Sequence, residues 1–221
     1  MRSDNEEFPD TILLNSGDET ATEDSSSPTV QFAEELEIIR KLTLPSIFSI
    51  QSYKVSLGEK TQKYTLLLDL DETLISARAE NGMITIRPHA MQLLKELSSL
   101  YELVIFTAAE EDHVLTALKY LDPEGQYINK VLSRKHCVLT EDKKYFIKDL
   151  RVISDRKLEE MLIVDNSIIS FAFHLENGIP VSSFYGNTAS DDELQYLIKY
   201  LTELYEEPDL ISANKAQIGL C

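Results

Sequence analysis

Three short runs of apolar residues constrain the fold of this chain more than any other feature. They are the continuous segments at residues 66–68 (LLL), 103–106 (LVIF) and 161–164 (MLIV), and a weaker run follows at 180–181 (PV). A strand with one face in water alternates apolar and polar residues, whereas a continuous run is typical of a strand buried on both faces. These segments therefore predict the central strands of a parallel sheet.

Helical patterns separate the predicted strands. Apolar residues recur with helical spacing over residues 90–100, 112–121 and 191–205. Strands that alternate with helices are typical of an α/β fold, in which helices cover both faces of the sheet. We predict a Rossmann-like three-layer sandwich around a mainly parallel sheet.

Each continuous run ends in polar residues. The first is followed by residues 69–73 (DLDET), the second by Thr107 and the third by Asp165 and Asn166. In open α/β sheets, ligands bind at the carboxyl ends of the strands. We therefore expect these three polar clusters to meet at one place.

Asp69 and Asp71 lie two residues apart, so their side chains project to the same side of an extended chain. Two ionised carboxylates this close repel unless a cation or a proton intervenes. Mg²⁺ prefers oxygen ligands, and a protonated carboxyl can donate a proton to a leaving oxygen. A carboxylate nucleophile that forms an aspartyl phosphate is one route to phosphate ester hydrolysis. By itself the pair is also compatible with a helix cap after a strand.

The segment at 66–75 (LLLDLDETLI) resembles the first motif of the haloacid dehalogenase superfamily. Its DLDETL form resembles the small phosphatases acting on the C-terminal domain of RNA polymerase II, the NLI-interacting-factor-like family. The resemblance runs from about Lys63 to Leu204. Further matching segments follow in order: 86–89 (IRPH), 104–109 (VIFTAA), 145–150 (YFIKDL), 162–167 (LIVDNS), 173–174 (FH) and 179–181 (IPV).

The resemblance implies roles for the residues of the first motif. Asp69 is implied as the nucleophile and as a magnesium ligand. Asp71 is implied as the general acid and then as the base that activates water, with its main-chain carbonyl on the metal. Thr73 is implied to position Asp71. Together these roles imply a magnesium-dependent phosphatase that passes through an aspartyl-phosphate intermediate.

The later motifs supply the remaining residues that the resemblance implies. Thr107, Ala108 and Lys148 are implied to bind the phosphoryl group, and Thr107 and Lys148 are counted among the catalytic residues. Asn166 is implied as a magnesium ligand, and Asp165 as a support for Lys148 or as part of the metal shell. The positive charge of one lysine and one Mg²⁺ nearly balances the negative charge of two aspartates and a phosphate.

None of the segments between the motifs is long enough for a large cap domain. Relatives that act on small metabolites commonly enclose the site with such a cap, so an uncapped site favours phosphoserine or phosphothreonine in a protein segment. Two alternatives stay open. One is a phosphatase for a small phosphorylated metabolite, with the N-terminal segment partly closing the site. The other is a non-catalytic interaction module, which needs a damaged site and a membrane anchor.

The sequence departs from the polymerase-directed relatives in two places. Those relatives carry a three-stranded insertion after the first motif, which helps to form a pocket for a proline-containing peptide. Only residues 76–85 separate the first motif from Ile86 here. We therefore do not expect that pocket, and the polymerase tail is not predicted as the substrate. The second departure is Ala109, where the family often has serine, and we expect little consequence.

The predicted domain boundaries are an acidic disordered tail at 1–28, a helical and linker segment at 29–58, and the phosphatase domain at 59–221. Within 29–58, a helical stripe is predicted to end before Pro45. The apolar residues of that stripe are Val30, Ala33, Leu36, Ile39 and Leu42. This predicted helix, at 30–42, either packs on the main domain or binds a partner.

The formal net charge is −17, and the longest basic runs are pairs. Nucleic-acid binding usually requires a basic patch, so we exclude a DNA or RNA substrate. No stretch approaches the roughly 18 apolar residues that cross a bilayer, and no membrane partner is expected. Two cysteines without a paired motif are typical of the nucleus or cytoplasm. The four histidines have no metal-like spacing, and we interpret them as structural or surface residues.

Overall fold

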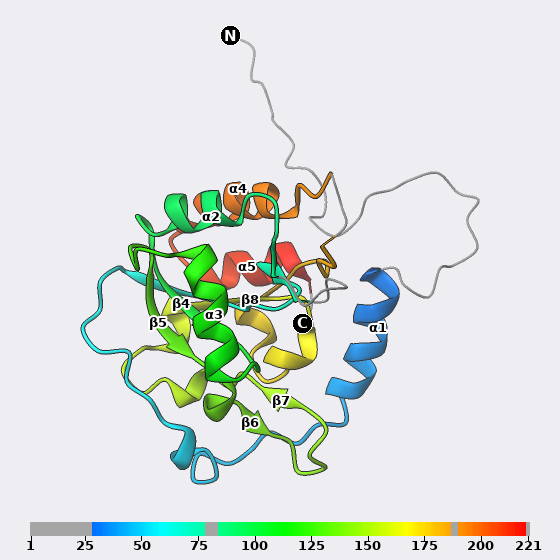
Figure 1. Ribbon diagram of the computed structural model, residues 1–221. Coiled ribbons are helices and arrows are strands. Elements are labelled where there is room, and N and C mark those ends of the chain that lie inside the picture. Colours follow the sequence, from blue (N-terminus) through cyan, green and yellow to red (C-terminus); the bar gives the residue numbers. More distant parts are fainter. Residues whose placement is uncertain (1–27, 78–83, 187–189, 220–221) are drawn as a thin grey trace, which may run out of the picture.

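The computed structural model describes residues 28–77, 84–186 and 190–219 (Figure 1). Its centre is a five-stranded sheet in the order β5-β4-β1-β8-β9, and every neighbouring pair is parallel. The strands are β1 (Tyr64–Leu68), β4 (Tyr101–Phe106), β5 (Ile128–Leu132), β8 (Met161–Asp165) and β9 (Gly178–Pro180). The prediction of an α/β fold around a mainly parallel sheet is confirmed.

The strand registers explain why the apolar runs are continuous. Leu67 pairs with Val104 on one side and with Ile163 on the other. Leu66 and Leu68 contribute to the apolar cluster on one face of the sheet, whereas Leu67 contributes to the cluster on the other face. Because successive side chains of a strand point to opposite faces, two buried faces require an apolar residue at every position.

Four helices cover one face of the sheet. They are α2 (Ala90–Leu97), α3 (Glu111–Leu121), α4 (Glu193–Tyr205) and α5 (Leu210–Ile218). Figure 1 shows α2 and α4 side by side, and the two helices are in contact. Their buried leucines pack against the strands, so the predicted helices between the strands are confirmed.

The other face is covered mainly by short 3-10 turns rather than by long helices. The turns are Gln51–Tyr53, Arg134–His136, Leu150–Val152, Leu158–Glu160, Ile168–Phe171 and Leu175–Asn177. The N-terminal helix α1 (Pro28–Ile39) adds Phe32 to this layer, and the chain after it adds the buried Ile50 and Leu57. The predicted boundary between 58 and 59 stays a prediction, although Ile50 and Leu57 share one apolar cluster with Leu67.

Helix α1 ends earlier than the sequence predicted. The last helical residue is Ile39. The Arg40 N–H still donates to a carbonyl four residues back, whereas the N–H groups of Lys41 and Leu42 donate to carbonyls three residues back. Of the two alternatives for this helix, the structure has the packed one, since Phe32 is buried and α1 contacts the turn at 168–171. The face that packs on the domain is therefore not open to a partner. The predicted tail, apart from Pro28, lies outside the described residues.

Several elements were not predicted. The edge strand β5 (Ile128–Leu132) carries exposed polar residues and lacks a continuous apolar run. Helix α5 follows Pro208, but its ends carry recognisable signals. The side chain of Asp209 caps its first turn, and Gly219 ends it in the left-handed conformation. Two hairpins were also missed, β2 (Ile75–Ser76) with β3 (Thr85–Ile86), and β6 (Val138–Leu139) with β7 (Phe146–Ile147).

In the described part of the segment after the first motif, β2 and β3 form a small antiparallel pair, and residues 78–83 lie outside the described residues. This agrees with the expectation of no large cap domain. No helix among the described residues is long and apolar enough to cross a membrane.

Candidate active site

Two buried aspartates stand at the carboxyl ends of neighbouring strands. Asp69 directly follows β1, and Asp165 is the last residue of β8. The two strands are paired, and the Asp69 N–H donates to the Val164 carbonyl at 2.9 Å. Asp69 is 5% exposed and Asp165 is 1% exposed. The sheet thus brings together two carboxylates that are far apart in the sequence.

Lys148 joins these two aspartates. It follows β7, and its main-chain N–H donates to the Ser170 carbonyl at 2.6 Å. Its ammonium group donates to both Asp69 Oδ1 and Asp165 Oδ2. Because all three side chains are buried, these charge-assisted bonds form in surroundings of low dielectric.

The balance of charge in this trio shows in the pKa values. Burial by itself lowers the pKa of Lys148, yet the Asp165 and Asp69 carboxylates together raise it above its usual range. Burial and repulsion from Asp69, opposed in part by Lys148, raise the pKa of Asp165 to about 7. One ammonium group therefore does not fully compensate two buried carboxylates.

Asp71 lies in the turn after Asp69 and is much more accessible. The turn is closed by the Leu74 N–H, which donates to the Leu70 carbonyl, and Glu72 adopts a left-handed conformation with φ +64°. The Asp71 side chain is 34% exposed, and His113 Nε2 lies 2.7 Å from its Oδ1. Asp71 is thus open to an incoming molecule, whereas Asp69 is almost enclosed.

The interpretation of His113 as a structural or surface residue stays a prediction, but the structure adds a contact with a predicted site residue that the sequence did not reveal. His113 lies in the first turn of α3, which starts at the carboxyl end of β4. A histidine in the first turn of a helix after the second motif is a signal that the sequence contained. His113 has no neighbour at the spacing typical of metal ligands, so that pattern does not single it out.

Thr73 and Asn166 contact each other across the site. The Thr73 hydroxyl donates to Asn166 Oδ1 at 3.3 Å, and Asn166 Nδ2 donates to Ser183 Oγ at 2.9 Å. The resemblance implied that Thr73 positions Asp71, but the hydrogen bond of its hydroxyl is made with Asn166. The fully buried Thr73 therefore joins the first-motif turn to the residues that follow β8.

Thr107 follows β4 and is buried, and its hydroxyl accepts the Ala109 N–H at 3.1 Å. The Ala108 carbonyl accepts from Arg134 Nε at 2.6 Å. Thr107 lies at the same edge of the sheet as Asp69, and no hydrogen bond within the described ranges joins the two side chains. Cys137 donates weakly to the Thr107 carbonyl, and burial raises the pKa of its thiol to about 12.

The oxygen donors fit the predicted Mg²⁺. The candidates are the Asp69 carboxylate, the Asp71 carbonyl and the Asn166 amide oxygen, which are the hard ligands that Mg²⁺ prefers. The surplus negative charge of Asp69 and Asp165 over Lys148 suits a divalent cation. Within the described ranges no three His, Cys, Asp or Glu side chains group as a metal site, so a metal here depends on amide and carbonyl oxygens too.

Arg87 supports the turn that carries the site, and the sequence singled it out only as part of a motif. Its guanidinium is buried and donates to the Thr73 carbonyl at 3.2 Å and to the Ser182 carbonyl at 2.8 Å. Its Nε lies 3.0 Å from each carboxylate oxygen of Asp191. Arg87 thereby ties the first-motif turn to the chain that follows β9.

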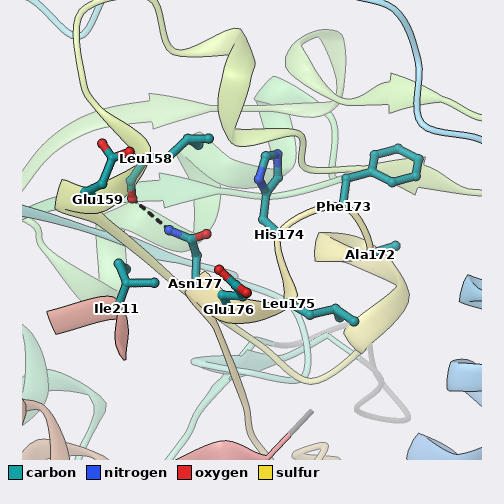
Figure 2. A pocket seen from close by; sticks show the side chains of 9 residues that line it. All are labelled: Leu158, Glu159, Ala172, Phe173, His174, Leu175, Glu176, Asn177 and Ile211. Carbon is teal, nitrogen blue, oxygen red and sulfur yellow. Dashed lines mark hydrogen bonds between the residues drawn. The ribbon is translucent and has the colours of Figure 1, made fainter. Parts of the chain in front are cut away.

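A separate pocket of about 470 Å³ lies away from the predicted site residues (Figure 2). Its polar wall includes Asn177, whose side chain donates to the Leu158 and Met161 carbonyls at the amino end of β8. The other lining residues include His174, Phe173 and Ile211. None of the predicted site residues lines it, so this pocket is not the site of the predicted chemistry.

Comparison with known proteins identifies the family of the chain. The model of the family described as "NLI interacting factor-like phosphatase" matches residues 64–211. The chain is 31% identical over 205 residues to "CTD small phosphatase-like protein 3" of Caenorhabditis elegans, covering 83% of this chain and 70% of that protein. It is 30% identical over 179 residues to "Carboxy-terminal domain RNA polymerase II polypeptide A small phosphatase 1" of Homo sapiens, covering 70% of this chain and 64% of that protein.

Among solved structures, the chain overlaps with "The Structure of Fcp1, an essential RNA polymerase II CTD phosphatase". The TM-score is 0.44 and the identity 18%, over 84% of this chain and 56% of that chain, a similarity too low to argue from. The family model and the nematode relative confirm the resemblance found in the motifs. The chain therefore belongs to the NLI interacting factor-like phosphatase family.

Proposed function

We propose that the chain hydrolyses phosphoserine and phosphothreonine in protein substrates, with Mg²⁺, through an aspartyl phosphate on Asp69. The observation that carries the proposal is the bonding of the enclosed Asp69 to Lys148, beside the exposed carboxylate of Asp71. The Asp69 carboxylate is held by Lys148, whereas the Asp71 carboxylate contacts His113 through Oδ1 and is accessible enough to meet an ester oxygen. Membership of a phosphatase family supports the same reaction class.

In the first step, an oxygen of Asp69 attacks the phosphorus atom and the bond from phosphorus to the seryl or threonyl oxygen breaks. Asp71 gives a proton to that leaving oxygen, as expected of a general acid within reach of it. Lys148 stabilises the negative charge of the phosphoryl oxygens while remaining bonded to Asp165. Thr107 and the main chain at Ala108 are proposed to bind the phosphoryl oxygens. The product of this step is the aspartyl phosphate on Asp69.

In the second step, Asp71, now ionised, takes a proton from water as that water attacks the phosphorus. The bond between phosphorus and the Asp69 oxygen breaks, and inorganic phosphate leaves. Asp69, the Asp71 carbonyl and Asn166 would hold the Mg²⁺, with Asp165 as a ligand or as support for Lys148. When bound, the ion supplies positive charge that offsets the phosphate and the surplus carboxylate charge.

The short β2–β3 hairpin leaves no room for a cap domain after the first motif, and this supports an exposed protein segment as the substrate. The polymerase tail is not proposed as that substrate, because only residues 76–85 stand where the polymerase-directed relatives carry an insertion. We propose the nucleus or cytoplasm as the compartment. A Schizosaccharomyces pombe relative, "Nuclear envelope morphology protein 1", is 30% identical and covers 73% of this chain.

The test is hydrolysis of para-nitrophenyl phosphate, with and without Mg²⁺, by the wild type and by Asp69→Asn. We expect turnover that depends on Mg²⁺ and a loss of at least about 10³-fold in the variant, since loss of a nucleophile removes the covalent route. Asp142→Asn, an exposed aspartate in the β6–β7 turn, is the matched control and is expected to keep its activity. Unchanged activity of Asp69→Asn would contradict the nucleophile assignment.

The substrate class is tested by comparing phosphoserine and phosphothreonine peptides with sugar phosphates. Higher kcat/KM on the peptides is expected from an uncapped site. Higher kcat/KM on sugar phosphates would support the metabolite alternative instead. A folded, Mg²⁺-loaded wild type without any turnover would support the interaction-module alternative.

A further inference from the structure

His113 makes a contact with the proposed general acid that the family resemblance did not assign. Its ring stands in the first turn of α3, and its Nε2 lies 2.7 Å from Asp71 Oδ1, 42 positions apart in the sequence. The two side chains are 33% and 34% exposed. They therefore lie where both a substrate and water can reach them.

The Asp71 carboxylate has few other constraints on its orientation. In the part of the chain that the structure describes, His113 is the one side chain within hydrogen-bond distance of it. The last torsion of an aspartate side chain has a broad distribution, so a carboxylate without such a partner samples many orientations. By contrast, Asp69 and Asp165 are both held by Lys148. The His113 contact is therefore what selects one orientation for Asp71.

The contact uses only one of the two Asp71 oxygens. With Oδ1 on His113, Oδ2 stays available for the proton that moves to the leaving oxygen. An imidazole nitrogen either donates or accepts depending on the tautomer, so this bond persists whether Asp71 is a carboxylate or a carboxylic acid. A partner of this kind suits a residue that gives a proton in one step and takes one in the next.

We propose that His113 is a positioning residue that orients Asp71 for proton transfer to the leaving oxygen. This inference rests on the proposed phosphatase function. It deepens that function, because correct placement of Asp71 matters most for esters of serine and threonine. Alkoxide leaving groups are strongly basic and need a proton, whereas para-nitrophenolate is a stable anion that leaves without one.

The test compares two substrates in the full chain with Mg²⁺, a phosphoserine peptide and para-nitrophenyl phosphate. For His113→Ala we expect kcat on the peptide to fall about 10- to 100-fold, a part of the 10²- to 10⁴-fold effect of general acid catalysis. On the aryl ester we expect a fall of less than about 3-fold, since the same principle gives proton transfer little to contribute there. His113→Gln, whose amide also donates and accepts, is expected to restore part of the peptide activity.

Two controls separate positioning from a general structural effect. Thr116→Ala removes an exposed hydroxyl one turn along α3 that bonds only the Asp112 carbonyl, and it is expected to leave both substrates unaffected. In an Asp71→Asn background, His113→Ala is expected to cause no further loss on the peptide, because coupled residues are not additive.

Equal losses on both substrates, or a full additional loss in the Asp71→Asn background, would overturn the positioning role. Equal losses would instead indicate that His113 contacts the phosphoryl group itself. Failure of the proposed function looks different, since the wild type would then not turn over the phosphoserine peptide at all, and the inference about His113 would fail with it.

Discussion

The two ends of the central sheet both bury charged side chains, but only at the amino end does the fully buried carboxylate have a cation of its own. There, Arg156 donates to both carboxylate oxygens of Glu102 at 2.7 and 2.8 Å, and the Thr65 hydroxyl donates to Glu102 at 2.8 Å. We call these three residues the amino-end cluster. The two parallel bonds from the guanidinium satisfy the fully buried carboxylate of Glu102. A second carboxylate, that of Asp155, lies 3.5 Å from Arg156, but its side chain is 27% exposed and reaches water.

The carboxyl-end cluster consists of Asp69, Lys148 and Asp165, and here one cation faces two carboxylates. The mismatch raises the pKa of Asp165 to about 7, because burial and the neighbouring Asp69 both disfavour its charge. A cluster with matched charges is complete without a ligand. A buried cluster with surplus negative charge favours the binding of a cation. The presence or absence of this surplus charge distinguishes a candidate active site from a structural ion pair.

The largest expected effect separates the two clusters by activity. Lys148→Met is expected to lower kcat/KM about 10³-fold, because the developing phosphoryl charge loses its buried ammonium group. Arg156→Lys removes the bidentate hydrogen bonding to Glu102 but keeps the positive charge. We expect kcat/KM per folded molecule to stay within about 3-fold of the wild-type value, because no contact with the transition state is lost. The measurement is steady-state kinetics with the folded fraction determined by circular dichroism. Similar losses of kcat/KM in both variants would contradict the distinction between a catalytic carboxyl-end cluster and a structural amino-end cluster.

The second effect concerns stability. Glu102→Gln is expected to lower the free energy of unfolding by about 3 kcal/mol, because the buried Arg156 loses its buried counter-charge and keeps only the partly exposed Asp155 at 3.5 Å. The measurement is urea denaturation. The matched control is Glu111→Gln, which removes a charge from an ion pair with Lys135 of the same 2.7 Å length.

The Glu111–Lys135 pair is exposed, with 59% and 61% of the two side chains accessible, so its removal is expected to cause no measurable change. Burial rather than distance is therefore the variable that this pair of variants tests. Equal effects in the two variants would show that the amino-end cluster contributes nothing by being buried.

The smallest expected effect concerns the stability contributed by Asp149, the neighbour of Lys148, which offers a buried carboxylate to compare with Asp165. Asp149 is fully buried, yet it accepts from His174 at 2.9 Å and from Arg151 at 2.6 Å. Burial alone would raise its pKa, but the bonds from His174 and Arg151 hold the pKa below its usual value of 3.8. Asp149 thus behaves in the opposite way to Asp165, although both carboxylates are buried.

Because the folded pKa of Asp149 lies below the unfolded one, its stabilisation is present above about pH 4 and is lost as the pH falls further. Asp149→Asn is expected to cost about 1–3 kcal/mol at pH 7, since the bonds to a charged acceptor are lost. Urea titrations of both proteins from pH 7 to pH 3 should show this difference shrinking below about pH 4. A difference that stays constant over this range would show that the charge of Asp149 is not involved.

Much of the sheet and of the site followed from short stretches of sequence. The apolar runs around Leu67, Val104 and Ile163 became paired central strands, because burial on both faces requires an apolar residue at each position. The placement of Asp69 and Asp165 at one edge followed from the rule that parallel strands end together. Strand β5 was missed because an edge strand is half exposed and its pattern resembles that of a loop.

The sequence by itself determined the central strands, the carboxylates at the strand ends and the family to which the chain belongs. Only the tertiary structure decided which partner each charged group has. Arg156 reaches Glu102 across 54 positions, His113 reaches Asp71 across 42, and Arg87 reaches Asp191 across 104. Local propensity and periodicity describe a residue and its near neighbours, whereas these contacts depend on how whole elements pack. The pairing that separates a matched cluster from a reactive one is for that reason a property of the fold.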